Sequence, residues 1–207
     1  MPRTLAPGPD VLVETEVKHS RFLAAVRRVG SSEEAAAFVD ERRRLHPDAR
    51  HHCWAFAVGA DPASRAERSS DDGEPGGTAG VPMLQVLHHR DLVDVAVVVT
   101  RWFGGIKLGA GGLVRAYSGA VAVALDSATL VERRRQEKYT FTVGHAEAGR
   151  VEAELRSRGV AVLDVAYTAL VTITVAARDR DELEGMVASL TSGAAELEPA
   201  GSEWVDA

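Results

Sequence analysis

The sequence has a single cysteine and no apolar run long enough to cross a membrane. One cysteine excludes an internal disulfide, and because Cys53 lies in the apolar run 53–58, we expect a buried, inert thiol. A membrane helix needs about 18 apolar residues, and the Met-Pro-Arg-Thr start lacks the apolar core of a signal peptide. The chain of 207 residues, 45% of them apolar, is therefore predicted to be a soluble, cytoplasmic, globular protein without a membrane partner.

The common signatures of enzymes and cofactor sites are also missing. The sequence contains no Gly-x-Ser-x-Gly, His-Glu-x-x-His or Cys-x-x-Cys. Segment 109–114 has Val114 where a dinucleotide fingerprint needs its last glycine, and no Gly-Lys-Ser/Thr supports a P-loop. His51 and His52 are adjacent strand residues that would point to opposite faces, which disfavours a shared metal. We therefore predict no cofactor and no metal site, while an enzyme with an unfamiliar site stays open as an alternative.

What the sequence has instead is two glycine-rich segments, 70–80 and 101–115, joined by a hydrophobic stretch. Glycine can adopt positive φ and lets the backbone approach a ligand or another backbone closely, so such segments are typical of contact surfaces. The first segment supplies a loop motif made of Asp71, Asp72, Gly73, Glu74, Pro75, Gly77, Thr78 and Gly80. The second supplies the candidate nucleic-acid or anion contacts Arg101, Lys107, Arg115, Gly104, Gly105, Gly109, Gly111 and Gly112.

A helix is predicted directly after the second segment. Its apolar stripe repeats at helical spacing through Leu113, Ala116, Tyr117, Ala120, Val121, Ala124 and Leu125. Free N–H groups and the positive end of the helix dipole would then face the glycine-rich loop, which is a physical basis for binding phosphate. The alternative is that the glycines only form a tight turn and that the cations are solvated. Trp102 and Phe103 could stack on bases. The alternative is that at least one of them lies in the core.

Three roles remain open for the carboxylates of Asp71, Asp72 and Glu74. They could hold a divalent cation or supply acid–base chemistry, although their spacing is not that of a calcium loop. They could order the turn by accepting backbone N–H groups. They could also pair with Arg101 or Lys107 across the two glycine-rich segments.

The rest of the first half alternates strand and helix signals. Ser31-Ser32-Glu33-Glu34 is a capping-box pattern that opens a helix, and Pro47 stops it. Pro82 fits the first turn of a short helix. We expect strands over 11–17, 21–29, 50–59 and 93–100, the last one central, helices over 31–45 and 82–87, and a long exposed loop over 61–80.

The second half reads as strand, helix, strand, strand, helix, strand. The expected strands cover 139–143, 160–167, 169–176 and 196–205, and the helices cover 148–159 and, after a cap at Asp179, 180–190. This βαββαβ order is the ferredoxin-like pattern. The net charge of −6 comes from this half. The chain up to Arg135 contains 18 Lys and Arg and 17 Asp and Glu, whereas the chain after Arg135 contains 6 Lys and Arg and 13 Asp and Glu. The charge step supports a boundary near 133–135 and disfavours polyanion binding by the second half, which could orient the first half or bind a protein partner.

Several segments resemble the Impact/YigZ family of cytosolic proteins in its bacterial two-domain form. The resemblance rests on 18–22 (Lys-His-Ser-Arg-Phe), 49–55 (Ala-Arg-His-His-Cys-Trp-Ala), the 70–80 loop and the 97–115 block. It implies an α+β protein with a ribosomal-protein-S5-domain-2-like domain over 1–132 and a ferredoxin-like domain over 136–207. Bacterial members have no settled activity. Eukaryotic relatives regulate translation by competing for an activator of an initiation-factor kinase, using an additional partner-binding domain for which we expect no counterpart here.

The resemblance and the residues together favour a translation-related regulator that binds RNA or the ribosome through the two glycine-rich loops. Arg101, Lys107 and Arg115 would contact phosphates. One alternative is a metal-dependent enzyme acting on a small phosphorylated ligand through Asp71, Asp72 and Glu74. The other alternative is a pure protein-interaction module.

Overall fold

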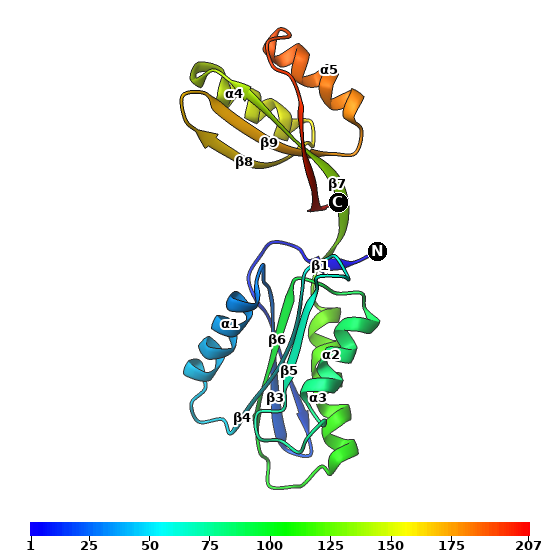
Figure 1. Cartoon of the computed structure of the whole chain (residues 1–207). Coiled ribbons are helices and arrows are strands. Elements are labelled where there is room, and N and C mark those ends of the chain that lie inside the picture. Colours follow the sequence, from blue (N-terminus) through cyan, green and yellow to red (C-terminus); the bar gives the residue numbers. More distant parts are fainter. The chain divides into compact units, whose positions relative to one another are not determined.

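The computed structural model describes residues 1–207, which divide into two compact units, Met1–Arg133 and Arg134–Ala207 (Figure 1). No helix combines the length and the apolar character needed to span a membrane. The first unit contains β1 (Arg3–Leu5), β2 (Val11–Val17), β3 (Ser20–Arg28), α1 (Ser32–Leu45), β4 (His51–Val58), β5 (Ala66–Ser70), α2 (Gly80–His89), β6 (Val95–Trp102) and α3 (Ala110–Asp126).

The first unit is built on an antiparallel sheet of order β2-β3-β6-β4-β5. The predicted central strand is confirmed as β6, which pairs with β3 and β4. Its residues Val95–Val99 are all at most 2% exposed. Such an uninterrupted apolar run is expected where both faces of a strand are covered.

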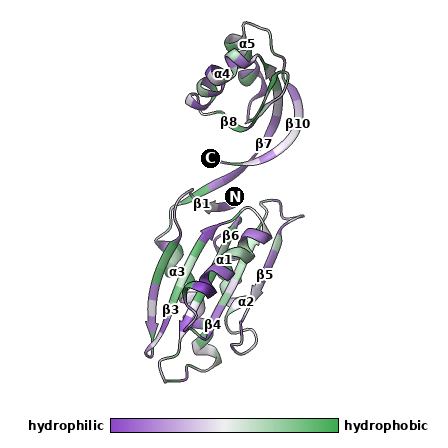
Figure 2. Cartoon of the chain, turned by 90° about the vertical axis from the view of Figure 1, so that its left-hand side faces the viewer, coloured by the Kyte–Doolittle hydropathy of each residue, from purple (hydrophilic) through white to green (hydrophobic).

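Helices cover both faces of this sheet (Figure 1). On one face, α2 and α3 pack with Val95, Val97 and Val99 of β6 in one core cluster. On the other face, α1 packs with Ala96 and Val98 in a second cluster. Figure 2 views the sheet with α1 in front of it. All seven residues of the predicted α3 stripe are buried, which confirms that interpretation.

The capping box of α1 is confirmed. The Ser31 hydroxyl accepts the Glu34 N–H at 3.2 Å, and the Glu34 carboxylate accepts the Gly30 N–H at 2.7 Å. The first bond satisfies a backbone donor that the first turn of the helix leaves free, and the second satisfies the donor of the residue before the N-cap. The helix ends at Leu45, two residues before Pro47.

The prediction of one long loop over 61–80 is wrong in part, because β5 lies within it and pairs with β4. The sequence of β5, Ala-Glu-Arg-Ser-Ser, is polar and at least partly exposed throughout. An edge strand is held by backbone hydrogen bonds on one side and needs no alternating apolar pattern. The short β1, which pairs with the start of β7 (Leu130–Val143), was not predicted either.

The second unit has the ferredoxin-like arrangement, and the predicted fold class is confirmed. After β7 come α4 (His145–Ser157), β8 (Ala161–Tyr167), β9 (Val171–Ala177), α5 (Arg180–Thr191) and β10 (Glu198–Asp206). The strand order is β10-β7-β9-β8, with both helices packed into one core. The predicted cap of α5 is also confirmed, because Asp179 accepts the N–H groups of Asp181 and Glu182 at 2.9 and 3.1 Å.

Candidate functional site

The carboxylate of Asp71 organises the first glycine-rich loop. One oxygen accepts the N–H groups of Ala79 and Gly80 at 2.9 and 2.8 Å, and the other accepts the Gly77 N–H at 2.8 Å. Burial raises the pKa of Asp71, but these three donors outweigh it and hold the pKa below its usual value. The role in turn structure proposed for this side chain is confirmed.

Asp72 ties the same loop to its surroundings. Its carboxylate accepts the His52 N–H at 2.7 Å and an Arg43 N–H at 2.8 Å. The backbone of Asp72 lies in the left-handed region, with φ of 43°. Asp71 and Asp72 therefore turn towards separate sets of donors within the fold.

Glu74 joins the two glycine-rich segments from inside the protein. One of its oxygens accepts from the Arg101 guanidinium at 2.5 Å and from the Tyr117 hydroxyl at 2.8 Å. The side chains of Glu74 and Arg101 are only 4% and 7% exposed. Pairing of Glu74 with Arg101, one of the roles left open by the sequence, is confirmed. The charge of Arg101 is therefore balanced within the fold.

A cavity of about 450 Å³ lies where the two segments meet. Three of its residues are cationic, namely Arg50, Lys107 and the buried Arg101, while Phe103 and Leu108 are apolar. Neither Lys107 nor Arg50 makes an ion pair. The full lining is Arg50, His51, Glu74, Pro75, Arg101, Phe103, Lys107, Leu108, Gly109, Ala110 and Leu113.

The first turn of α3 forms one side of this cavity. Gly109 is its N-cap, with φ of 73°, and no side chain caps the helix. The first turn has no acidic residue, so the free N–H groups keep their positive potential. Arg115 does not line the cavity; its guanidinium lies beside the same turn, 3.5 Å from where a Cβ on Gly111 would be. Gly112 leaves room for the Leu108 side chain, since a Cβ there would be 2.9 Å from it.

Other glycines of the two segments serve close contacts within the backbone. A Cβ on Gly104 would overlap the His19 backbone in the turn between β2 and β3, and the Gly104 N–H donates to the Ser20 hydroxyl at 3.1 Å. A Cβ on Gly80 would lie 2.7 Å from the Ser70 nitrogen. Positive φ values are found at Gly73, Gly77 and Gly105.

The expectation that Trp102 or Phe103 fills the core is wrong. Trp102 is half-buried and donates from Nε1 to Asp48 at 2.8 Å, with the Arg21 guanidinium 4.5 Å from its ring centroid. Phe103 is 54% exposed. Strand β6 ends at Trp102, so Phe103 has already left the sheet and its ring lines the cavity.

The sequence did not indicate that Arg50 and His51 line the cavity. Arg50 directly precedes β4, and His51 is the first residue of β4 and is paired with Arg101 of β6. Both strands were predicted, but nothing in the local sequence sets the register between them. Cys53, two residues further along β4, is fully buried as predicted, and burial raises its pKa to about 12.

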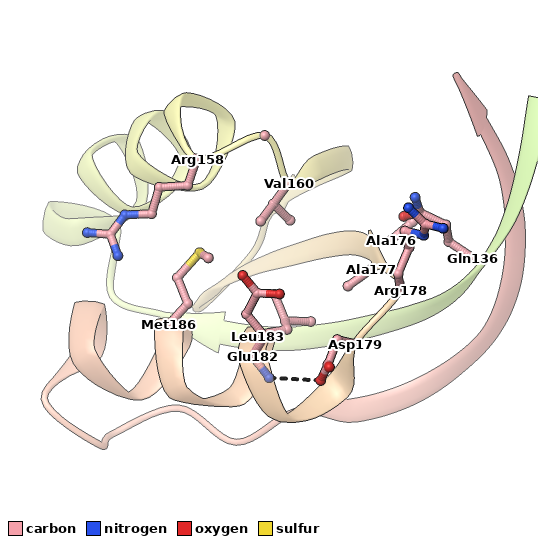
Figure 3. Close-up of a pocket in the computed structure, with 11 residues that line it drawn as sticks. Gln136, Arg158, Val160, Ala176, Ala177, Arg178, Asp179, Glu182, Leu183 and Met186 are labelled. Carbon is pink, nitrogen blue, oxygen red and sulfur yellow. Dashed lines mark hydrogen bonds between the residues drawn. The ribbon is translucent and has the colours of Figure 1, made fainter. Parts of the chain in front are cut away.

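The second unit has a smaller cavity, of about 160 Å³, at the start of α5 (Figure 3). Its helix N-terminus differs from that of α3, because the Asp179 carboxylate caps it and the first turn holds Asp181 and Glu182. These carboxylates oppose an anionic ligand there. The cavity beside α3 is the stronger candidate for a functional site.

Comparison with known proteins covers nearly the whole chain. Models of the Impact N-terminal domain and of a domain of unknown function, DUF1949, match residues 18–125 and 141–194. IMPACT family member YigZ of Escherichia coli (strain K12) is 38% identical over 195 residues, which are 93% of this chain and 96% of that protein. IMPACT family member YvyE of Bacillus subtilis (strain 168) is 36% identical over 186 residues, with 89% and 85% covered.

A solved structure described as the crystal structure of a hypothetical protein has the same architecture. It is 38% identical, with a TM-score of 0.71, over 95% of this chain and 97% of that one. The matched range 18–125 contains every residue that lines the cavity. The chain belongs to the IMPACT family.

Proposed function

We propose that this protein is a cytoplasmic, translation-related regulator that binds RNA or the ribosome through the first unit. The binding surface consists of the two glycine-rich loops around the first turn of α3. Lys107 and Arg115 contact phosphates, and the backbone at Gly109 and Gly111 allows close approach. Membership of the IMPACT family supports the link to translation, because its eukaryotic members regulate that process.

The observation that carries the proposal is the uncapped first turn of α3 with several cations close to it. Lys107 and Arg50 line the cavity next to this turn, and Arg115 lies beside Gly111. The dipole and the free N–H groups of a helix N-terminus attract phosphate, and neighbouring cations add to that attraction. Arg101 contributes differently, because its guanidinium is paired with Glu74 and it positions the loops.

The second unit has a separate role in this proposal. The chain after Arg135 carries 6 Lys and Arg against 13 Asp and Glu, so its charge opposes a polyanion. We assign it to orienting the first unit or to binding a protein partner.

Co-sedimentation with ribosomes and ribosomal subunits across a salt series tests the proposal. The wild type is compared with Lys107→Glu/Arg115→Glu and with the control Arg44→Glu, an exposed arginine on α1 at the opposite face of the sheet. We expect the double variant to lose binding. A weaker double variant, Lys107→Gln/Arg115→Gln, should lower the slope of log K against log salt by about 1.4 to 1.8, because each phosphate contact contributes about 0.7 to 0.9. Unchanged binding by the folded double variants, or equal loss in the control, would refute the proposal.

The alternative of a metal-dependent enzyme has less support from the contacts of the loop. Asp71, Asp72 and Glu74 accept from separate donors, and no group of three His, Cys, Asp or Glu side chains is arranged to hold a metal ion. Failure of the wild type to bind ribosomes or RNA would favour a pure protein-interaction module.

A further inference from the structure

The cavity beside α3 combines a cationic side with an apolar, aromatic side. Its cations are Arg50, Lys107 and Arg101, and Phe103, Leu108 and Pro75 are the apolar part. A site for phosphate alone would need only the cationic residues. We infer that the cavity binds one nucleoside monophosphate unit, with the phosphate at the first turn of α3 and the base against Phe103. This inference rests on the proposed function and names the ligand unit that the same site takes.

The phosphate end is defined by two independent features. The first is the N-terminus of α3, which has glycine as its N-cap, no side-chain cap and no acidic residue in its first turn. The second is the pair of cations Arg50 and Lys107, which line the cavity and have no carboxylate partner of their own. A phosphate bound at the helix start would accept hydrogen bonds from these charged groups.

The base end is defined by Phe103. This residue is 54% exposed, although it follows a strand whose residues are almost all buried. The Arg101 guanidinium lies 5.7 Å from the centroid of this ring, which keeps the cation and the aromatic surface together. Aromatic side chains at such positions stack on unpaired bases whatever their sequence.

The size of the cavity limits the ligand. About 450 Å³ lies within the range of about 300 to 1,000 Å³ typical of small-molecule sites, which suits a ligand of the size of one nucleotide. The unit is therefore a free mononucleotide or a nucleotide unstacked from an RNA strand. In a strand, bases must leave the stack before they meet an aromatic side chain.

Isothermal titration calorimetry on the full chain tests the inference with AMP, UMP, adenosine, inorganic phosphate and single-stranded oligoadenylate. We expect the two nucleotides to bind, and adenosine and phosphate to bind at least tenfold more weakly. Phe103→Ala should weaken AMP binding about 5- to 150-fold, the usual effect of losing one stacking contact, and leave phosphate binding unchanged. Lys107→Gln should weaken AMP and phosphate alike.

Two matched controls accompany these variants. Tyr167→Ala removes an aromatic ring that is 62% exposed on β8, and Arg44→Gln removes an exposed cation on α1. Both should bind AMP as the wild type does. The inference is overturned if AMP fails to bind, or if Phe103→Ala binds it unchanged while urea unfolding shows that the variant is folded.

The oligonucleotide and the ribosome assay separate the two proposals. Binding of AMP and of the oligoadenylate, both lost in Phe103→Ala, supports the inference with RNA as the source of the nucleotide. Binding of AMP without RNA or ribosome binding supports it with a free nucleotide as the source, and it overturns the proposed function. Ribosome binding without AMP binding overturns the inference and leaves the proposed function standing.

Discussion

The buried pair of Glu74 and Arg101 offers the strongest test of how the two glycine-rich segments are held together. In Glu74→Leu, Arg101 loses its anionic partner while remaining almost fully buried, and its other contact, to the Ser20 hydroxyl, is 3.4 Å long. Tyr117 also loses its acceptor. Removing one partner of a buried ion pair typically costs about 3 to 5 kcal/mol. This is a large fraction of the roughly 5 to 15 kcal/mol by which proteins are stable.

Urea unfolding followed by tryptophan fluorescence measures this cost. Trp54 and Trp102 lie in the first unit and Trp204 in the second, so a Trp204→Phe background reports on the first unit alone. With a slope of about 2 kcal/mol per M, the loss corresponds to a fall of about 1.5 to 2.5 M in the urea midpoint.

The double variant Glu74→Leu/Arg101→Met serves as the control. It removes both charges, and apolar replacement of a whole buried pair is often neutral or stabilising. We therefore expect it to be more stable than Glu74→Leu. A loss below about 1 kcal/mol in the single variant, or a double variant no more stable than the single one, would contradict the assignment of Glu74 as the charge partner of Arg101.

Three further predictions concern the thiol, acid stability and two glycines. With a pKa of about 12, Cys53 in the native protein should resist alkylation at pH 8 and react only in urea; rapid labelling of the folded chain would refute its burial. Hydrogen bonds from Arg27 and Arg42 lower the pKa of Glu41 from 4.5 to about 2, so its stabilising effect is complete above pH 4.5 and is lost as the pH falls towards 2. Urea midpoints of Glu41→Gln should lack this part of the decline, and equal acid sensitivity would contradict it. Gly104→Ala should destabilise the first unit by at least about 1 kcal/mol, because the new Cβ would overlap the backbone of the neighbouring turn. Gly119→Ala should stabilise the same unit by about 0.5 to 1 kcal/mol, because Gly119 lies inside α3 and has open space around its Cα. Differential scanning calorimetry that ranks the two variants in the opposite order would refute both predictions.

Periodic patterns predicted the elements well because burial imposes them. In α3 the apolar residues repeat at helical spacing because one face of the helix is buried, and in β6 they are continuous because both faces of the strand are buried. Both predictions are confirmed. The order of elements in the second half was enough to predict its ferredoxin-like fold. By contrast, the sequence did not predict β5, because an exposed edge strand is held by backbone hydrogen bonds and needs no apolar pattern.

The candidate site was predicted less completely, since it depends on contacts between distant residues. The sequence indicated the two loops, the helix start and the exposed cation Lys107. It also raised the pairing of Glu74 with Arg101 as one alternative. It did not indicate Tyr117 as a second donor to Glu74, because a tyrosine in an apolar stripe looks like any other core residue. Nor could it bring Arg50 to the cavity, because strand register is set by the whole sheet.

The three hydrogen bonds from backbone N–H groups to the Asp71 carboxylate affect the thermodynamics of binding. They fix the course of residues 71–80 before any ligand arrives. A glycine-rich loop without such hydrogen bonds would lose conformational entropy on binding a ligand, and that loss would weaken its affinity for the ligand. Here the ordering occurs during folding instead. Asp71→Asn should therefore weaken ligand binding through a larger entropic penalty in calorimetry, even though Asp71 does not line the cavity.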